Sequence, residues 1–204
     1  MKGIFIKNFN FLDEVKIKRR QFIQKLCLWF FGGYFFSGCA SMFKGSSKIQ
    51  ENRDGKSLFF SDEEFNTLGA VQNCILPGGV SSPDAQAIGA MTYLERFFSY
   101  PDFKDQYFIF IQDGLNRLNK NALRKKNKNF YALDVEDREN LLLEFEKEGF
   151  NRDWLMFVIA LTVEALLSDP IYGGNKNEMG WKWLEYSPKF PRPTKPYAGS
   201  MNGV

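Results

Sequence analysis

From residue 61 onward, apolar residues recur every three or four positions, the period of an α-helix with one buried face. The first of these segments follows Ser61, where the order Ser-Asp-Glu-Glu is a capping box that predicts a helix start. Pro77 and the two glycines after it end this helix. A second start is predicted at Ser82, which would serve as N-cap with Pro83 in the first helical position.

Three further helices are expected. One covers residues 103–122, and the next extends from an N-cap at Asp134 to Gly149. The last, from about Asp153 to Ser168, is apolar on nearly every side but shorter than the roughly 20 residues that cross a bilayer, so it should be the central buried helix. Because period-2 alternation is weak throughout, we predict an all-α fold, a compact bundle of about five helices within residues 61–204.

The composition changes after the last helix, where Gly, Pro, Asn and aromatic residues replace the periodic apolar ones. Such a segment predicts an irregular aromatic and proline-rich tail that packs against the helices, with a tight turn where the glycines stand. It has two interpretations: a capping loop that seals the bundle, or an aromatic surface that docks a partner. The residues concerned are Asp169, Pro170, Tyr172, Gly173, Gly174, Asn175, Gly180 and Trp181.

The first 38 residues have the character of an export signal. They contain seven Lys or Arg against two acidic residues, and then an apolar run over 26–36 that is too short to span a bilayer but suits a signal peptide. Ser37 and Gly38 precede Cys39, which is the pattern of a lipobox. We therefore expect a signal peptide over 1–38, lipidation of Cys39 and a tether over 39–60.

The basic part of this leader resembles a twin-arginine signal, which is read by a translocon that moves folded proteins. The residues that carry the resemblance are Arg19, Arg20, Phe22 and Lys25.

Residues 39–204 hold 20 basic and 22 acidic residues, so the body has no overall attraction to nucleic acid.

Composition narrows the possible chemistry. The chain has no histidine and only three cysteines, none of them in a C-x-x-C pair, which excludes Ser-His-Asp and Cys-His catalysis and gives no support to haem, iron–sulfur or zinc sites. We therefore predict no catalytic, cofactor-binding or metal-binding residue in this chain. Glu164 in the apolar helix is interpreted as a helix-edge residue that reaches water or a basic partner; the alternative is a proton-transfer group in a hydrolase together with Asp169.

Two segments resemble the gluconate 2-dehydrogenase subunit 3 family, the small subunit of membrane-bound, flavin-dependent sugar and sugar-acid dehydrogenases. The first is the tail motif from Asp169 to Asn175, followed by Gly180-Trp181-Lys182, Leu184 and Tyr186. The second lies in residues 75–95 and comprises Ile75-Leu76-Pro77, Pro83-Asp84-Ala85, Gly89 and Tyr93-Leu94-Glu95.

The resemblance implies a complex of three subunits: an FAD-containing large subunit, a multihaem cytochrome c with haem c, and this chain, which binds no cofactor itself. Our hypothesis is that Arg19 and Arg20 direct the twin-arginine translocon to export the large subunit together with this chain to the periplasmic side of a bacterial membrane, where the lipid anchor expected at Cys39 would hold it. The alternative is a stand-alone envelope lipoprotein with a structural or binding role.

Overall fold

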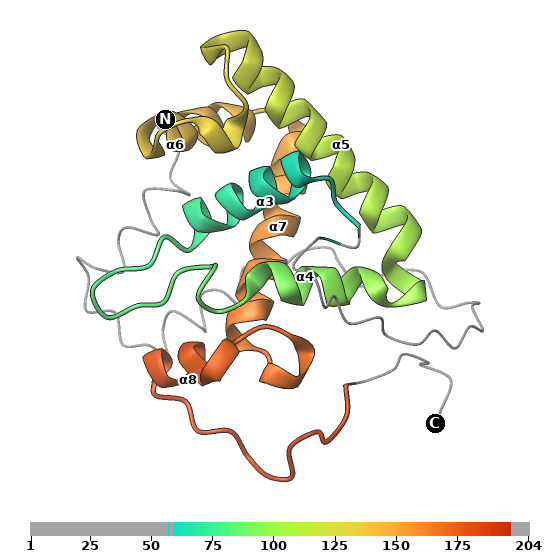
Figure 1. Cartoon of the computed structure of the whole chain (residues 1–204), viewed down its shortest axis with the longest axis vertical. Helices are drawn as coiled ribbons and strands as arrows, with labels where there is room; N and C mark the ends of the chain where they lie inside the picture. Colours follow the sequence, from blue (N-terminus) through green and yellow to red (C-terminus); the bar gives the residue numbers. More distant parts are fainter. Residues whose placement is uncertain (1–56, 58, 197–204) are drawn as a thin grey trace. The chain divides into compact units, whose positions relative to one another are not determined.

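The computed structural model describes residue 57 and residues 59–196, all within one compact unit that spans residues 45–204 (Figure 1). This part of the chain contains helices and no strand, so the all-α prediction is confirmed. The export-signal residues and the predicted lipidation site, Cys39, lie outside the described residues. The helices are α3 (Asp62–Ile75), α4 (Ala90–Ser99), α5 (Pro101–Lys126), α6 (Val135–Phe145), α7 (Gly149–Leu167) and α8 (Met179–Leu184), with 3-10 turns η1 (Phe130–Ala132), η2 (Pro170–Tyr172) and η3 (Lys176–Glu178).

Helix α3 begins where the capping box predicts. The Glu64 amide donates to the Ser61 hydroxyl at 3.3 Å, and the Ser61 amide donates to the Glu64 carboxylate at 2.9 Å. Asp134 also caps as predicted, because its carboxylate accepts from the Asp137 amide at 2.8 Å at the start of α6. The starts of α3 and α6 could therefore be predicted from the sequence, because a capping side chain accepts a hydrogen bond from a free backbone amide of the first turn.

The predicted helix start at Ser82 is wrong, because α4 begins only at Ala90. The Asp84 carboxylate accepts from the Ala87 amide at 2.6 Å, and residues 85–89 form turns instead of a helix. Gly89 then takes a left-handed φ of 76° as the N-cap residue. Ser and Asp side chains that bond to nearby backbone stabilise turns as well as helix starts, so the signal was ambiguous.

Helix α7 is the central helix, as predicted, and packs against α3, α4, α5 and α8 (Figure 1). It begins at Gly149, about one turn earlier than predicted from Asp153, and the preceding α6 ends at Phe145. Trp154 is completely buried and its indole N–H donates to the Ile111 carbonyl at 3.0 Å. This packing requires glycine at position 114, since a Cβ there would lie 2.1 Å from the Trp154 ring.

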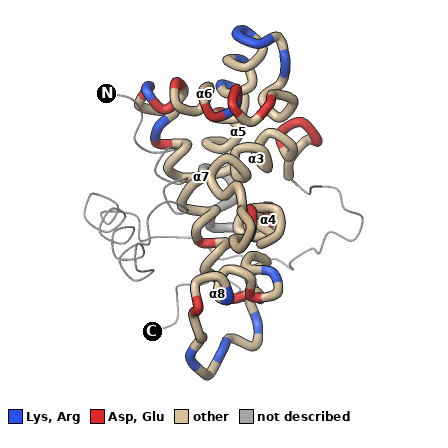
Figure 2. Tube along the Cα trace, turned by 90° about the vertical axis from the view of Figure 1, so that its left-hand side faces the viewer, with Lys and Arg blue, Asp and Glu red and all other residues tan. Residues whose placement is uncertain are grey.

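Charged residues are unevenly distributed over the body (Figure 2). Basic residues gather at the C-terminal end of α5, where Lys126 pairs with Asp137 at 2.5 Å and Lys125 pairs with Glu144. Cations are favoured at this end of a helix, because it is the negative end of the helix dipole. From Trp154 to Leu167, in contrast, α7 carries one charged residue, Glu164.

No helix in the described ranges is both long and apolar enough to cross a membrane.

Candidate functional site

The two segments that carry the family resemblance meet in space at the C-terminal end of α7. Leu76, Ala85, Ile88 and Ala90, which lie in the segment of residues 75–95, form one buried cluster with residues of α7. Side chains of α4 and α8 cover this cluster. The members that complete it are Ala165 and Leu166, with Tyr93, Met179 and Trp183 packed against them.

The turn after α7 is also tied to α4 and to the residues before it. The Lys176 amide donates to the Ile88 carbonyl at 3.0 Å, and the Arg96 guanidinium donates to the Ile171 carbonyl at 2.6 Å. Gly173 has a left-handed φ of 94°, and a Cβ there would lie 2.8 Å from the Arg96 side chain. Glycine is therefore needed at this position both for its backbone conformation and for its close contact.

Asn175 joins the end of α7 to the start of α8. It is fully buried, its side-chain amide donates to the Ser168 carbonyl at 3.0 Å, and its side-chain oxygen accepts from the Gly180 amide at 2.8 Å. Its φ of 46° is left-handed, a conformation that Asn tolerates better than most residues. One side chain thus satisfies a carbonyl and an amide that would otherwise be buried without partners.

Gly174 and Gly180 are explained by close packing on the last turn of α7. A Cβ at Gly174 would lie 2.4 Å from the Ala165 carbonyl oxygen, and a Cβ at Gly180 would lie 2.1 Å from that of Leu166. Any side chain at either position would push the tail away from the helix. The tail is less irregular than predicted, because residues 179–184 form α8, a helix too short for its apolar period to be recognised.

Trp181 anchors α8 within this chain. The side chain is 6% exposed, its indole N–H donates to the Leu167 carbonyl at 2.8 Å, and Tyr186 packs edge-on at 5.6 Å between ring centres. These contacts favour the interpretation of the tail as a capping loop, since little of the indole is left for another protein to touch.

Asp169 and Arg192 fasten the end of the tail. Asp169 accepts from the Ile171 amide at 3.1 Å and from the Arg192 guanidinium at 2.8 Å, and Arg192 also donates to Glu178 at 2.7 Å. The bond from Arg192 lowers the pKa of the Asp169 carboxyl, and the two carboxylates raise the pKa of Arg192. The role of Arg192 is not visible in the sequence, because a lone arginine in a proline-rich segment has no partner that spacing could reveal.

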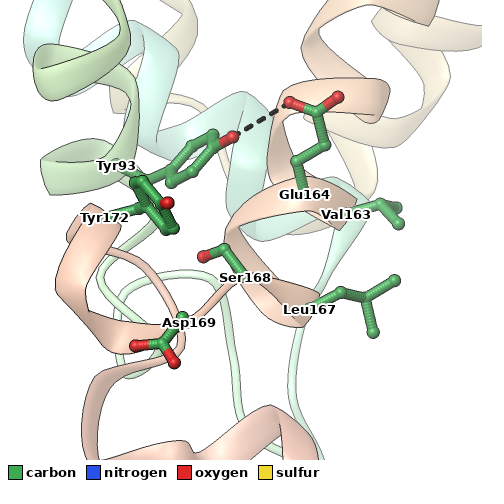
Figure 3. Close-up of a pocket in the computed structure, with 7 residues that line it drawn as sticks. All are labelled: Tyr93, Val163, Glu164, Leu167, Ser168, Asp169 and Tyr172. Carbon is green, nitrogen blue, oxygen red and sulfur yellow. Dashed lines mark hydrogen bonds between the residues drawn. The ribbon is translucent and has the colours of Figure 1, made fainter. Parts of the chain in front are cut away.

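An open hollow of about 420 Å³ lies beside the last turns of α7 (Figure 3). Tyr93 of α4 and Tyr172 of η2 project toward that turn, and the Tyr93 hydroxyl donates to the Glu164 carboxylate at 3.0 Å. The hollow is lined mainly by carbon atoms. Its lining residues are Tyr93, Val163, Glu164, Leu167, Ser168, Asp169 and Tyr172.

Glu164 is an exposed residue at the edge of α7, as predicted, although its partner is a tyrosine rather than a basic residue. Desolvation by its neighbours raises the pKa of the Glu164 carboxyl, an effect that the bond from Tyr93 partly opposes. Desolvation and the adjacent carboxylate also raise the pKa of Tyr93, which keeps its proton and remains a donor. Because Asp169 is engaged by Arg192 and the Ile171 amide, the hollow offers a ligand one carboxylate rather than an acid–base pair.

The remaining reactive groups of the described residues are few. Cys74 is half-buried, and burial raises the pKa of its thiol to about 11, so the reactive thiolate is scarce at neutral pH. No group of three or more Cys, Asp or Glu side chains in residues 57 and 59–196 is placed to hold a metal ion.

Comparison with known proteins gives one match. The family model described as Gluconate 2-dehydrogenase subunit 3 matches residues 62–188, from the start of α3 to the tail beyond α8. No curated protein and no solved structure matches significantly. The matched range includes both segments that pack around the end of α7.

Proposed function

The chain belongs to the gluconate 2-dehydrogenase subunit 3 family, and from this membership we propose that it is a non-catalytic accessory subunit that assists the assembly and export of a flavin-dependent dehydrogenase. In this proposal a large subunit binds FAD and oxidises the sugar or sugar acid, and a cytochrome subunit with haem c accepts the electrons. The observation that carries the proposal is the family match over residues 62–188.

The structure of the body supports a binding role for this chain. The distinctive residues of the tail motif bond to the chain itself: Asn175 to backbone groups, Trp181 to the end of α7, and Asp169 to Arg192. Through these contacts they hold the end of the helical body together. A rigid, preformed surface is what a subunit needs to bind a partner without a large loss of conformational entropy.

In this proposal, the leader of residues 1–38 directs the export of this chain and of the large subunit bound to it. Arg19 and Arg20, with Phe22 and Lys25 after them, resemble a signal for a translocon that accepts folded cargo. A flavoprotein must acquire FAD before it crosses the membrane by such a route, so a bound subunit with the signal can carry it across. Cleavage before Cys39 and lipidation of its thiol would then hold the complex on the periplasmic side of the membrane.

The test is co-purification from the envelope of the native host through an affinity tag at the C-terminus of this chain. We expect a larger, yellow, FAD-containing protein to be recovered with it. The double substitution Arg19→Lys and Arg20→Lys keeps the positive charge but should leave both proteins in the cytoplasm. Lys16→Arg is the matched control and should export both.

Three results would count against the proposal in different ways. A flavoprotein that reaches the periplasm in the double variant would exclude co-export but not assembly. Recovery of the tagged chain without any flavoprotein would favour the stand-alone lipoprotein. Turnover of a sugar by the isolated chain would refute the non-catalytic role.

A further inference from the structure

A stripe of aromatic side chains lies on the face shared by α4, α5 and α7. We call it the aromatic stripe; its members are Phe97, Tyr107, Phe110, Phe150 and Phe157. Tyr107 and Phe157 are stacked with 5.4 Å between ring centres, and Phe110 touches both Phe157 and Phe150 at 5.8 and 5.2 Å. Every member is partly exposed, and Tyr107 is 40% exposed.

The aromatic stripe leads toward the hollow around Glu164. Phe97 stands four residues after Tyr93 on α4, and Phe157 stands seven residues before Glu164 on α7. Residues at these spacings occupy the same face of a helix. The rings of the stripe and the hollow are therefore parts of one surface that follows α7.

Glu164 is the one acidic group of this surface that has no basic partner in the described part of the chain. Its hydrogen bond comes from the neutral Tyr93 hydroxyl, whereas Asp169, the other acidic residue that lines the hollow, is paired with Arg192. The Tyr93 ring points its hydroxyl at the carboxylate, and Tyr172 lies next to Tyr93 on the same side of the hollow (Figure 3). The charge of the carboxylate attracts a cation, and the carbon atoms that line the hollow suit the apolar stem of a lysine or arginine side chain.

We propose that the hollow receives a lysine or arginine side chain of the partner subunit, and that apolar side chains flanking this cation pack on the aromatic stripe. The inference rests on the proposed function, because the partner is the large subunit of that complex. Charge decides between classes of occupant: an anionic ligand such as a sugar acid would be repelled by Glu164, whereas a basic side chain meets it with opposite charge. Arginine and aromatic residues are also the types most often found at the energetic centre of protein interfaces.

The test is the affinity of the purified complex with Glu164→Gln, which removes the charge and keeps the shape. We expect the dissociation constant for the large subunit to rise at least about tenfold and its dependence on salt to weaken. Glu136→Gln, an exposed carboxylate on α6, is the matched control and should change neither quantity. Equal thermal stability of the two variants would exclude a folding defect as the cause.

A photo-reactive benzoylphenylalanine in place of Leu167, an exposed residue of the hollow, identifies the occupant directly. We expect a cross-link to a peptide of the large subunit that contains Lys or Arg. A cross-link to a second copy of this chain or to its own residues 1–38, or an unchanged affinity with Glu164→Gln, would overturn the inference and leave the proposed function intact. If the wild-type chain binds no large subunit, the proposed function and this inference both fail.

Discussion

Gly180→Ala tests the seating of the tail on the last turn of α7. The added Cβ would lie 2.1 Å from the Leu166 carbonyl oxygen and 3.1 Å from the Asn175 side-chain oxygen. The nearest atom belongs to the backbone and cannot rotate away, so α8 must shift by more than an ångström to restore ordinary contact. That shift lengthens two hydrogen bonds, from the Gly180 amide to Asn175 and from the Trp181 indole to Leu167.

The expected loss combines two opposing effects. Overpacking costs about 1–3 kcal/mol and each weakened hydrogen bond about 1 kcal/mol, whereas alanine gains about 0.5–1 kcal/mol over glycine in a helix. The free energy of unfolding should therefore fall by about 2–4 kcal/mol, which lowers the melting temperature by roughly 5–15 °C in a protein of this size.

The assay is urea unfolding followed by circular dichroism, with Gly69→Ala as the matched control. Gly69 lies within α3 and a Cβ there meets nothing within 4 Å, so this variant should gain stability by about 0.5–1 kcal/mol. If Gly180→Ala unfolds at the wild-type midpoint, α8 does not rest on α7 as described. The reasoning about the tail motif would then be wrong.

Two further predictions concern titratable groups. Because Arg192 lowers the pKa of Asp169 in the folded state, the stability that this pair contributes is complete above the unfolded pKa of about 4 and is lost as the pH falls through the lower folded value. Arg192→Gln should therefore be less stable than wild type at pH 7, and urea titrations should show the difference shrinking in acid; a difference independent of pH would contradict the ion pair. The pKa of about 11 at Cys74 predicts that iodoacetamide labels this thiol about a hundredfold more slowly at pH 8 than an ordinary cysteine, measured by mass spectrometry in a Cys27→Ser, Cys39→Ser background. Labelling that is no faster in urea would show that burial does not protect it.

The sequence predicted those parts of the fold that local chemistry determines. The caps at Ser61 and Asp134 and the continuous apolar run of α7 are local signals, and the helices they predict were confirmed. The start of α4 was mispredicted because Asp84 forms a turn with the same type of bond that caps a helix. Helix α8 was missed because six residues are too few to show a period, and its stability comes from contacts with α7.

The candidate site was harder to predict, because its residues come from separate helices. The tail motif was visible in the sequence, but its role in closing the end of α7 depends on distances to Ala165 and Leu166 that no spacing encodes. The hollow joins Tyr93 to Glu164 across 71 positions of the chain. Glu164 stands out in the sequence as a charge in an apolar helix, but its partner Tyr93 does not, because the two residues are far apart in the chain.

Motif residues that already make contacts within this chain help to locate the partner surface, because they are not free to form it. A motif residue that is buried and hydrogen-bonded within its own chain maintains the shape of the subunit, as Asn175 and Trp181 do, and cannot also serve as an accessible anchor. The groups still able to bind another protein are those whose charge or ring faces remain available. On α7 these include the Glu164 carboxylate, so in our proposal the tail motif supports the binding surface from behind rather than forming it.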